Sequence, residues 1–332
     1  IVAVTGSVGK TSTKDAIYVV MSKSFHVRKS EKSFNSEIGV PLTILGCNTA
    51  WNNPIKWLAN LWSGLSQIIF TQSYPEWLVL EVGADRPGDI AKISTWLKPN
   101  IVVVTKLADI PVHIEYFKNK AEVVTEKGKL VDALKHDGVL ILNSDDADVF
   151  AFRNKFANRV VTYGQFGDAE VRATNYSVYY SENNNDPYGI YFKVEHNNNC
   201  LPVKIIGTLG ANNIYAALAA ISVGIALNLN LVEATENLQN YISPRGRMNL
   251  IKGIKGSTII DDTYNSSPVA VTSALNTLKD LKIVSGRKIA ILGDMMELGK
   301  HTVEAHEAAG IFAASVCNIL VTVGLRSRSL AE

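Results

Sequence analysis

Short apolar runs alternate with segments of helical periodicity along the first half of the chain. The runs are 1–4 (IVAV), 77–82 (WLVLEV), 100–105 (NIVVVT), 138–143 (GVLILN) and 160–163 (VVTY), and the helical segments include Thr11–Ser22, Lys120–Leu134 and Ala147–Phe156. Strands and helices that alternate in this way are typical of a parallel sheet with helices on both faces. We therefore predict a doubly wound, mostly parallel α/β sheet.

The pattern changes between about Glu170 and Ile206, where apolar and polar residues alternate with period two. The turn-forming runs NNNDPYG and NNN interrupt this stretch. We predict a small antiparallel insert or flap here. The apolar stretch 214–227 that follows is too short to span a bilayer and predicts a buried helix over 212–227.

Proline and two glycines in YISPRGRMN (241–249) interrupt the pattern and indicate a domain boundary. Beyond it, three strands over 257–262, 287–294 and 318–324 alternate with helices near 267–281 and 302–315. We expect one domain over 1–243 and a second α/β domain over 244–332. The chain starts inside a strand and stops at the start of a helix, so we expect both ends to be incomplete.

Composition excludes several classes of protein. The 332 residues are 47% apolar, and 33 basic against 31 acidic side chains leave a net charge of +2, as in a soluble globular protein. Without a basic block, we expect neither a nucleic-acid partner nor attraction to an anionic membrane surface. Cys47, Cys200 and Cys317 show no paired spacing, and no signal peptide is visible. We expect a cytoplasmic protein with no membrane insertion.

The strongest local motif is IVAVTGSVGKTSTKD (1–15), in which an apolar strand leads through a glycine turn into Lys-Thr-Ser at the start of a helix. Backbone N–H groups of such a loop surround phosphate oxygens, the lysine adds a positive charge, and a hydroxyl can bind Mg²⁺. The alternative is an ordinary strand-to-helix turn with a surface lysine. The candidate phosphate ligands are Thr5, Gly6, Ser7, Val8, Gly9, Lys10, Thr11 and Ser12.

Three further residues are candidates because they follow predicted strands or accompany the loop. Glu81 ends an apolar strand and is a natural partner for Mg²⁺, although a capping or salt-bridged acid is the alternative. His113 follows the next strand and could bind a metal or phosphate, although a loop histidine is more often solvated. Lys127 lies in a helix among charged neighbours, where an exposed lysine is the default expectation.

The order of the motifs resembles one family. These are TGSVGKTSTKD, SFNSEIGVPLTIL (33–45), LEVGADRPGDI (80–90), HIEYF (113–117), EKGKL (126–130), LNSDD (142–146), GTLGANNIYAALAA (207–220), PRGRMN (244–249), IIDDTYNSSP (259–268) and ILGDMMELGKHTVEAHEAAG (291–310). Together they resemble the successive motifs of Mur ligases, and the last two and IGVPLT are most similar to the members that add D-alanyl-D-alanine.

The resemblance implies three domains: one for the UDP-sugar, a central ATPase domain, and a C-terminal Rossmann-like domain. This chain resembles the second and most of the third, so we expect the N-terminal UDP-binding domain to be absent from it. The implied activity is that of an ATP-dependent, ADP-forming amide ligase of peptidoglycan synthesis. It would join D-alanyl-D-alanine to UDP-N-acetylmuramoyl-tripeptide through an acyl phosphate. A monomer using ATP and two Mg²⁺ ions is expected.

The resemblance also implies roles for single residues. Thr11 and Glu81 would bind one Mg²⁺ and His113 the other, oriented by a carbamylated Lys127. Asn213 and Asn265 would contact adenine, Asp262 the ribose and Arg247 the phosphates, while Asn35 lies in the substrate-side loop. Lys10, Lys127 and His113 are the implied catalytic residues.

The sequence departs from the family pattern at several positions. The loop from Lys106 to His113 is longer than usual and has lysine where asparagine is common, while Ser36, Asn212 and Ala216 also replace common residues. Two other functions stay open. One is a different ligase on the same scaffold, such as a folylpolyglutamate synthase or a muramyl ligase-like amidotransferase subunit, although the motifs ILGDMMELG and DDTYNSSP argue against it. The other is a nucleotide-binding module without ligase activity, which the missing first domain and the altered residues 106–113 suggest.

Overall fold

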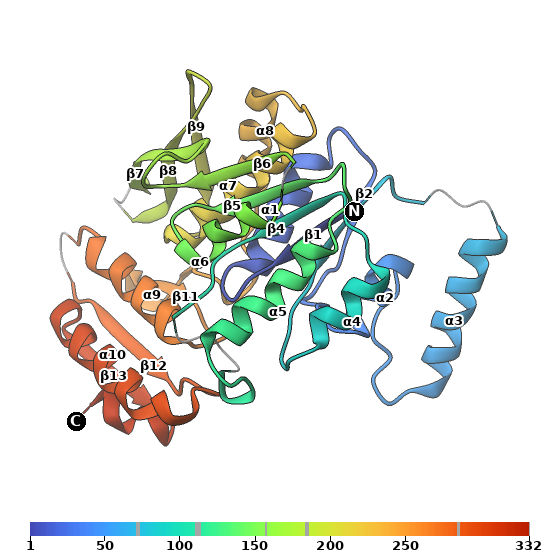
Figure 1. The fold of residues 1–332 in the computed structure, drawn as a ribbon. Coiled ribbons are helices and arrows are strands. Elements are labelled where there is room, and N and C mark those ends of the chain that lie inside the picture. Colours follow the sequence, from blue (N-terminus) through green and yellow to red (C-terminus); the bar gives the residue numbers. More distant parts are fainter. Residues whose placement is uncertain (71–73, 110–113, 157, 183–185, 284–285, 332) are drawn as a thin grey trace.

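The computed structural model describes residues 1–332 except 71–73, 110–113, 157, 183–185, 284–285 and 332. Its main feature is one nine-stranded sheet (Figure 1) with the order β2-β3-β1-β4-β5-β6-β7-β8-β9. The strands are β1 (Val2–Thr5), β2 (Val27–Lys29), β3 (Trp77–Glu81), β4 (Ile101–Val104), β5 (Val139–Asn143), β6 (Val160–Gly164), β7 (Val171–Tyr180), β8 (Pro187–His196) and β9 (Asn199–Ile206). The pairs from β2 through β7 are parallel. The predicted α/β fold class is confirmed.

The predicted insert is antiparallel, since β7 pairs with β8 and β8 with β9 in that sense. It is not a separate flap, however. Gly164 and Tyr163 of β6 pair in parallel with the start of β7, which joins the insert to the central sheet. The polar and apolar alternation fits this position, because one face packs on the core and the other faces outward.

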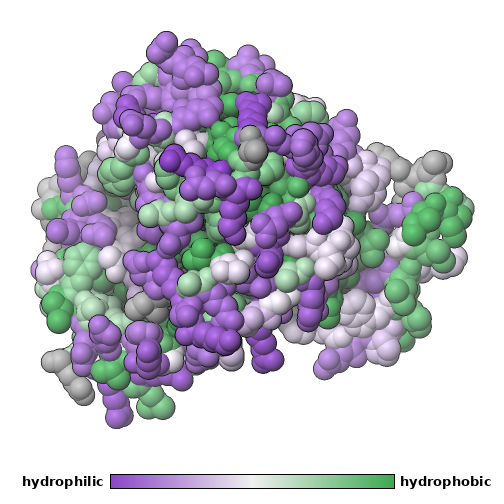
Figure 2. Space-filling view, viewed as in Figure 1, coloured by the Kyte–Doolittle hydropathy of each residue, from purple (hydrophilic) through white to green (hydrophobic). Residues whose placement is uncertain are grey.

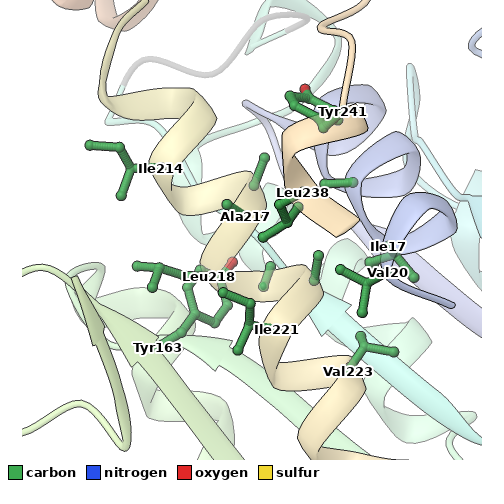
Figure 3. Close-up of a cluster of buried hydrophobic side chains, with 14 of the residues drawn as sticks. Ile17, Val20, Tyr163, Ile214, Ala217, Leu218, Ile221, Val223, Leu238 and Tyr241 are labelled. Atoms are coloured by element: carbon green, nitrogen blue, oxygen red, sulfur yellow. The ribbon is translucent and has the colours of Figure 1, made fainter. Parts of the chain in front are cut away.

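Helices cover both faces of the sheet. Successive side chains of β1 point to opposite faces, so Val2 and Val4 belong to one buried cluster and Ala3 to another. The first cluster is covered by α1 (Lys10–Met21) and α7 (Ala211–Ala226). Figure 3 shows Leu218 and Ile221 of α7 beside Tyr163 of β6. The second is covered by α4 (Asp89–Trp96) and α5 (Lys120–Asp132).

The remaining helices of this part are α2 (Gly39–Leu45), α3 (Pro54–Ile69), α6 (Ala147–Phe150) and α8 (Leu231–Asn237). Figure 1 shows α3 at the edge of the molecule, away from the central sheet. Within the described part of the chain, every helix is too short or too polar to cross a bilayer. The apolar helix predicted over 212–227 is α7, which is largely buried.

A separate C-terminal α/β domain follows. Its elements are β10 (Asn249–Lys252), β11 (Thr258–Asp261), α9 (Pro268–Asp280), β12 (Ile289–Gly293), α10 (Thr302–Val316) and β13 (Ile319–Val323). The parallel pair β12–β13 packs with α9 and α10 around a third buried cluster. The three predicted strands do not form one sheet, because β10, which the pattern did not reveal, pairs with β11 in an antiparallel hairpin.

Candidate active site

The glycine turn after β1 is shaped by the end of β4. Gly6 has a φ of 142°, and a Cβ at this position would collide with the Thr105 hydroxyl. The Thr105 hydroxyl donates to the carbonyl of Val8 at 2.7 Å, and the carbonyl of Lys106 accepts from Ser7 N at 2.7 Å. Only glycine fits this close approach. These contacts therefore fix the conformation of the turn without a bound ligand.

The helix that follows begins with free backbone donors. Gly9, with a φ of 85°, is the N-cap of α1, and no side chain of the described residues caps this end. The N–H groups of the first turn carry the positive end of the helix dipole. This end of α1 lies at the carboxyl edge of the parallel sheet, where open α/β sheets bind ligands.

A hydroxyl and two polar side chains meet at Glu81, at the end of β3. The Thr11 hydroxyl donates to Glu81 Oε2 at 2.9 Å, and Asn35 Nδ2 donates to Glu81 Oε1 at 3.1 Å. Ser33 Oγ lies 2.8 Å from Thr11 Oγ1. Glu81 is buried, and neither of these hydrogen-bond partners is charged. Hydroxyl and carboxylate oxygens are hard ligands of the kind that Mg²⁺ prefers.

Two lysines lie close to this edge without an ion pair among the described residues. Lys127, on α5, is only 5% exposed, so the expectation of an exposed lysine is wrong. Burial lowers the pKa of Lys127 to about 7, and the positive charge of Lys10 contributes. Burial also lowers the pKa of Lys10, which Glu81 partly offsets while Arg247 adds to the lowering. The two lysines therefore repel each other, and the nearby carboxylates of Glu81, Asp85 and Glu126 only partly offset the lowering of their pKa values.

Arg247 reaches this edge from the segment that joins the two domains. Its guanidinium carbon stacks 4.2 Å from the ring centroid of Tyr264, and its Nε is buried without a hydrogen-bond partner among the described residues. The joining segment is itself fixed, because Ser243 Oγ donates to the carbonyl of Arg247 at 2.7 Å. Asp262 accepts from Met248 N at 3.2 Å, and burial raises its pKa to about 6.

Three of the buried polar atoms that lack partners lie around the same loop. Within the described ranges these are Thr5 Oγ1, Ser7 Oγ and Arg247 Nε, whereas the others belong to Gln67 on α3, Ser94 on α4 and Asn237 on α8. Buried polar groups are normally hydrogen-bonded, and unsatisfied ones indicate a missing ligand or water. Together with the charges of Lys10 and Arg247, these donors fit an anion with several oxygens. A triphosphate is such an anion.

The predicted adenine contacts are less favourably placed. Asn213 is 2% exposed, and its Nδ2 donates to Thr208 Oγ1 and to the carbonyl of Leu209, both at 2.8 Å. Its Oδ1 accepts from Tyr241 and Ser243 at 3.2 and 3.3 Å. This amide joins α7 to the joining segment, so contact with a base would require some of these hydrogen bonds to be released. Its neighbour Asn212 instead lines a small cavity beside the phosphate loop. Asn265 is exposed.

The second proposed metal ligand lies outside the described residues, since His113 falls within 110–113. In the described part of the chain, no three His, Cys, Asp or Glu side chains form a group that could hold a metal. The Thr11–Glu81 pair thus remains the candidate metal site, and the roles predicted for Lys10, Lys127 and the other site residues stay predictions.

Sequence reasoning missed a buried lysine that shapes the site. Lys14 on α1 is fully buried, and its Nζ donates to the carbonyl of Ser30 at 2.6 Å and to that of Lys32 at 3.4 Å. These bonds hold the loop that carries Ser33 and Asn35 towards Glu81. The only available signal was the position of Lys14, one turn after Lys10 on the same helix.

Family models match both parts of the chain. The Mur ligase middle domain matches residues 4–53 and 61–222, and the Mur ligase glutamate ligase domain matches 246–332. The chain belongs to the Mur ligase family. The glycine turn after β1, Glu81 at the end of β3 and the segment that joins the two domains thus belong to a Mur ligase chain.

Curated relatives and solved structures agree with this membership. The chain is 28% identical over 335 residues to the UDP-N-acetylmuramoyl-tripeptide–D-alanyl-D-alanine ligase of Bacillus subtilis, covering 100% of this chain and 64% of that protein. It is 26% identical to the Escherichia coli ligase of the same name, and the match covers 100% of this chain and 66% of that protein. The chain thus spans about two thirds of the length of these relatives.

MurF structures share the fold. MurF from Acinetobacter baumannii matches with a TM-score of 0.81 and 23% identity, over 100% of this chain and 65% of that one. MurF from Thermotoga maritima in complex with ADP matches with a TM-score of 0.80 and 24% identity, over 99% of this chain and 68% of that one. The Mur ligase fold therefore extends over the whole chain.

Proposed function

We propose that this chain is the ATP-binding and C-terminal part of a MurF-type ligase. The enzyme would join D-alanyl-D-alanine to UDP-N-acetylmuramoyl-tripeptide and release ADP and phosphate. The observation that carries the proposal is the convergence of the phosphate loop, the Thr11–Glu81 pair and two lysines at one sheet edge. The names of the relatives support the choice of substrates. A monomeric, cytoplasmic enzyme belongs to the same proposal.

In this proposal the triphosphate of ATP lies on the glycine turn and the first turn of α1. Ser7 Oγ and Arg247 Nε, which are buried without partners among the described residues, would donate to phosphate oxygens. Lys10 and Arg247 would offset the charge that develops as an anionic carboxylate approaches the γ-phosphate. For the base and ribose we retain Asn213, Asn265 and Asp262 as candidates, and we add Asn212 because it lines the adjacent cavity.

The Thr11 hydroxyl and the Glu81 carboxylate fit a hard cation, and we propose them as ligands of one Mg²⁺. Bound there, Mg²⁺ would neutralise phosphate charge. The Thr11–Glu81 hydrogen bond would give way, leaving both oxygens free to coordinate. His113 and a modified Lys127 are proposed for a second ion.

Lys127 is suited to carbamylation because it is buried and has a depressed pKa. Its neutral amine would add to CO₂, and the carbamic acid formed would release its proton. The side chain would then carry a negative charge beside Lys10, where an ammonium is repelled. The repulsion between the Lys127 ammonium and Lys10 would thereby become an attraction between the Lys127 carbamate and Lys10.

The reaction needs a better leaving group than the carboxylate itself offers. Transfer of the γ-phosphoryl group to the tripeptide carboxylate gives an acyl phosphate and ADP. The amine of D-alanyl-D-alanine then attacks the acyl carbon, phosphate leaves, and the amine loses a proton. The protein contributes positioning and charge neutralisation, and closure of the domains would keep water from the acyl phosphate.

The proposal is tested with the full-length protein, ATP and Mg²⁺. We expect ADP release only when both UDP-N-acetylmuramoyl-tripeptide and D-alanyl-D-alanine are present, with the amide product detected by mass spectrometry. Turnover with a folate and glutamate instead would favour the folylpolyglutamate synthase alternative, and amide formation from an ammonia donor would favour the amidotransferase. ATP binding without turnover under all conditions would favour a non-catalytic module.

A further inference from the structure

The helix α3 has its polar side against the protein and its apolar side in solvent. Asn60 Nδ2 donates to the carbonyl of Asn48 at 2.8 Å, and Gln67 Nε2 donates to that of Leu45 at 2.7 Å. Gly64 is its one buried residue and packs on the Leu45 side chain. This is the reverse of an ordinary surface helix, whose apolar stripe faces the core.

The solvent side of α3 forms a continuous apolar face. Seven side chains of the helix are 47% to 83% exposed, namely Ile55, Leu58, Leu61, Trp62, Leu65, Ile68 and Ile69. At 100° per residue they cover an arc of about 140°. Trp51 and Phe70 extend the face beyond the two ends of the helix, with exposed fractions of 81% and 56%. Figure 2 shows hydrophobic surface, in green, at the right edge of the molecule, where Figure 1 places α3.

The face is apolar and almost uncharged. No Asp or Glu occurs between Glu37 and Glu76, and Lys56 is the single basic residue in that interval. A protein interface normally surrounds its apolar centre with a polar rim. A helix pair with a second copy would bury a narrower stripe than this arc. Both observations favour an occupant without fixed shape or charge.

The helix is also peripheral and partly outside the family pattern. It stands at the edge of the molecule (Figure 1), so a flat surface can reach it. The family's middle-domain model leaves residues 54–60 unmatched, and these form the first turns of α3. A binding partner shared by all family members would therefore not explain why this chain carries these residues.

We propose that α3 binds a lipid bilayer surface, with its apolar face immersed at the boundary between headgroups and acyl chains. Interfacial helices of this kind place Trp, Phe and Leu in the membrane and keep a polar face on the other side. Here the polar face is attached to the protein through Asn60, Gly64 and Gln67. The helix is too short to span a bilayer, so it lies in the plane of the surface.

Hydrophobic insertion rather than charge drives this binding. The near balance of charge in the chain excluded electrostatic attraction to anionic lipid, and the proposal does not need it. Binding is therefore expected to phosphatidylcholine vesicles as well as to vesicles that contain phosphatidylglycerol. It should persist at high salt, where electrostatic binding is screened.

The test is flotation of the full-length protein with vesicles of these two compositions, at low and high salt. The variant replaces four exposed side chains of the face by Leu58→Gln, Leu61→Gln, Ile68→Gln and Ile69→Gln. We expect the partition coefficient to fall by at least about 100-fold, because each immersed Leu or Ile contributes to partitioning. ATPase activity should be unchanged, since the face lies outside the site.

The matched control removes four exposed apolar side chains elsewhere, with Phe166→Gln, Ile254→Gln, Ile311→Gln and Leu325→Gln, which are 70% to 82% exposed. The control should bind vesicles as the unchanged protein does. Tryptophan emission should shift to the blue on vesicle addition in the unchanged protein and the control. The shift should be absent in the α3 variant.

Four results would overturn the proposal. The first is failure of the unchanged protein to float with either vesicle. The second is equal loss of binding in the control, and the third is binding to anionic vesicles alone that salt abolishes. The fourth is a dimer, detected by light scattering, that the α3 variant dissociates while no vesicle binding occurs. That result would make a second copy the occupant.

Discussion

Replacing the buried Lys127 by methionine is expected to stabilise the folded protein while it abolishes ligase activity. Lys127 is 5% exposed, and no hydrogen bond or ion pair with another described residue compensates its ammonium. Methionine has a similar length, fills the same space and carries no charge. The variant therefore removes the cost of desolvation together with the group that we propose to be carbamylated.

The magnitude follows from the pKa. In the unfolded chain the amine has its ordinary pKa of 10.5, and burial lowers it to about 7 in the folded protein. Such a difference corresponds to roughly 5 kcal/mol at pH 6, where both states are protonated. Because the folded pKa is the lower one, the penalty disappears as the pH rises from about 7 towards 10.5. At pH 9 it should be about 2 kcal/mol.

The assay is urea unfolding of both proteins between pH 6 and 9 in CO₂-free buffer, so that the lysine stays unmodified. Lys14→Met is the matched control, since Lys14 is also fully buried but donates hydrogen bonds to backbone carbonyls and forms an ion pair with Asp15 at 3.4 Å. Its removal should destabilise the protein by roughly 3 kcal/mol, because it leaves those acceptors unpaired. Added bicarbonate should stabilise the unchanged protein and leave Lys127→Met unaffected.

A loss of stability in Lys127→Met at pH 6 would refute this reasoning. So would a gain that does not shrink as the pH rises, since a packing effect would be independent of pH. Equal effects of the Lys14 and Lys127 replacements would show that burial alone, and not the lack of a partner, decides the outcome.

Four further outcomes test the site. Lys10→Ala should abolish ATP turnover with circular dichroism unchanged, because Lys10 makes no contact that the core needs; turnover in the folded variant would exclude its phosphate role. Lys127→Ala should lose synthesis and recover part of it with added short-chain carboxylates that replace the carbamate; full activity without them would leave no role for the modification. Arg247→Ala should raise the Michaelis constant for ATP about tenfold or more and remove the compaction that scattering detects when ligands bind, as expected if the second domain completes the nucleotide site. Gly6→Ala should lower the free energy of unfolding by about 2 kcal/mol or more and block turnover, because its Cβ collides with Thr105; a neutral effect in urea unfolding would contradict the turn geometry.

Local patterns in the sequence determined the glycine loop and most strands of the sheet, although the short edge strand β2 was not among the predicted runs. The runs at 77–82 and 138–143 became β3 and β5, because a strand buried on both faces must be apolar along its length. The loop after β1 was predictable because a glycine turn between strand and helix is a short-range requirement. The ends of parallel strands lie at one edge of the sheet, which also predicted that Glu81 lies near this loop. The structure shows Glu81 hydrogen-bonded to Thr11.

The tertiary structure alone decided the environment of single side chains. Lys127 has charged neighbours in sequence, and only the packing of α5 against the sheet buries it. Asn213 matched a motif, yet its amide is occupied by residues that lie up to 30 positions away. The strand β11 pairs with β10 rather than with a later strand, and α3 turns its apolar side outward. Backbone periodicity is local, whereas burial, hydrogen-bond partners and pKa depend on segments that only folding brings together.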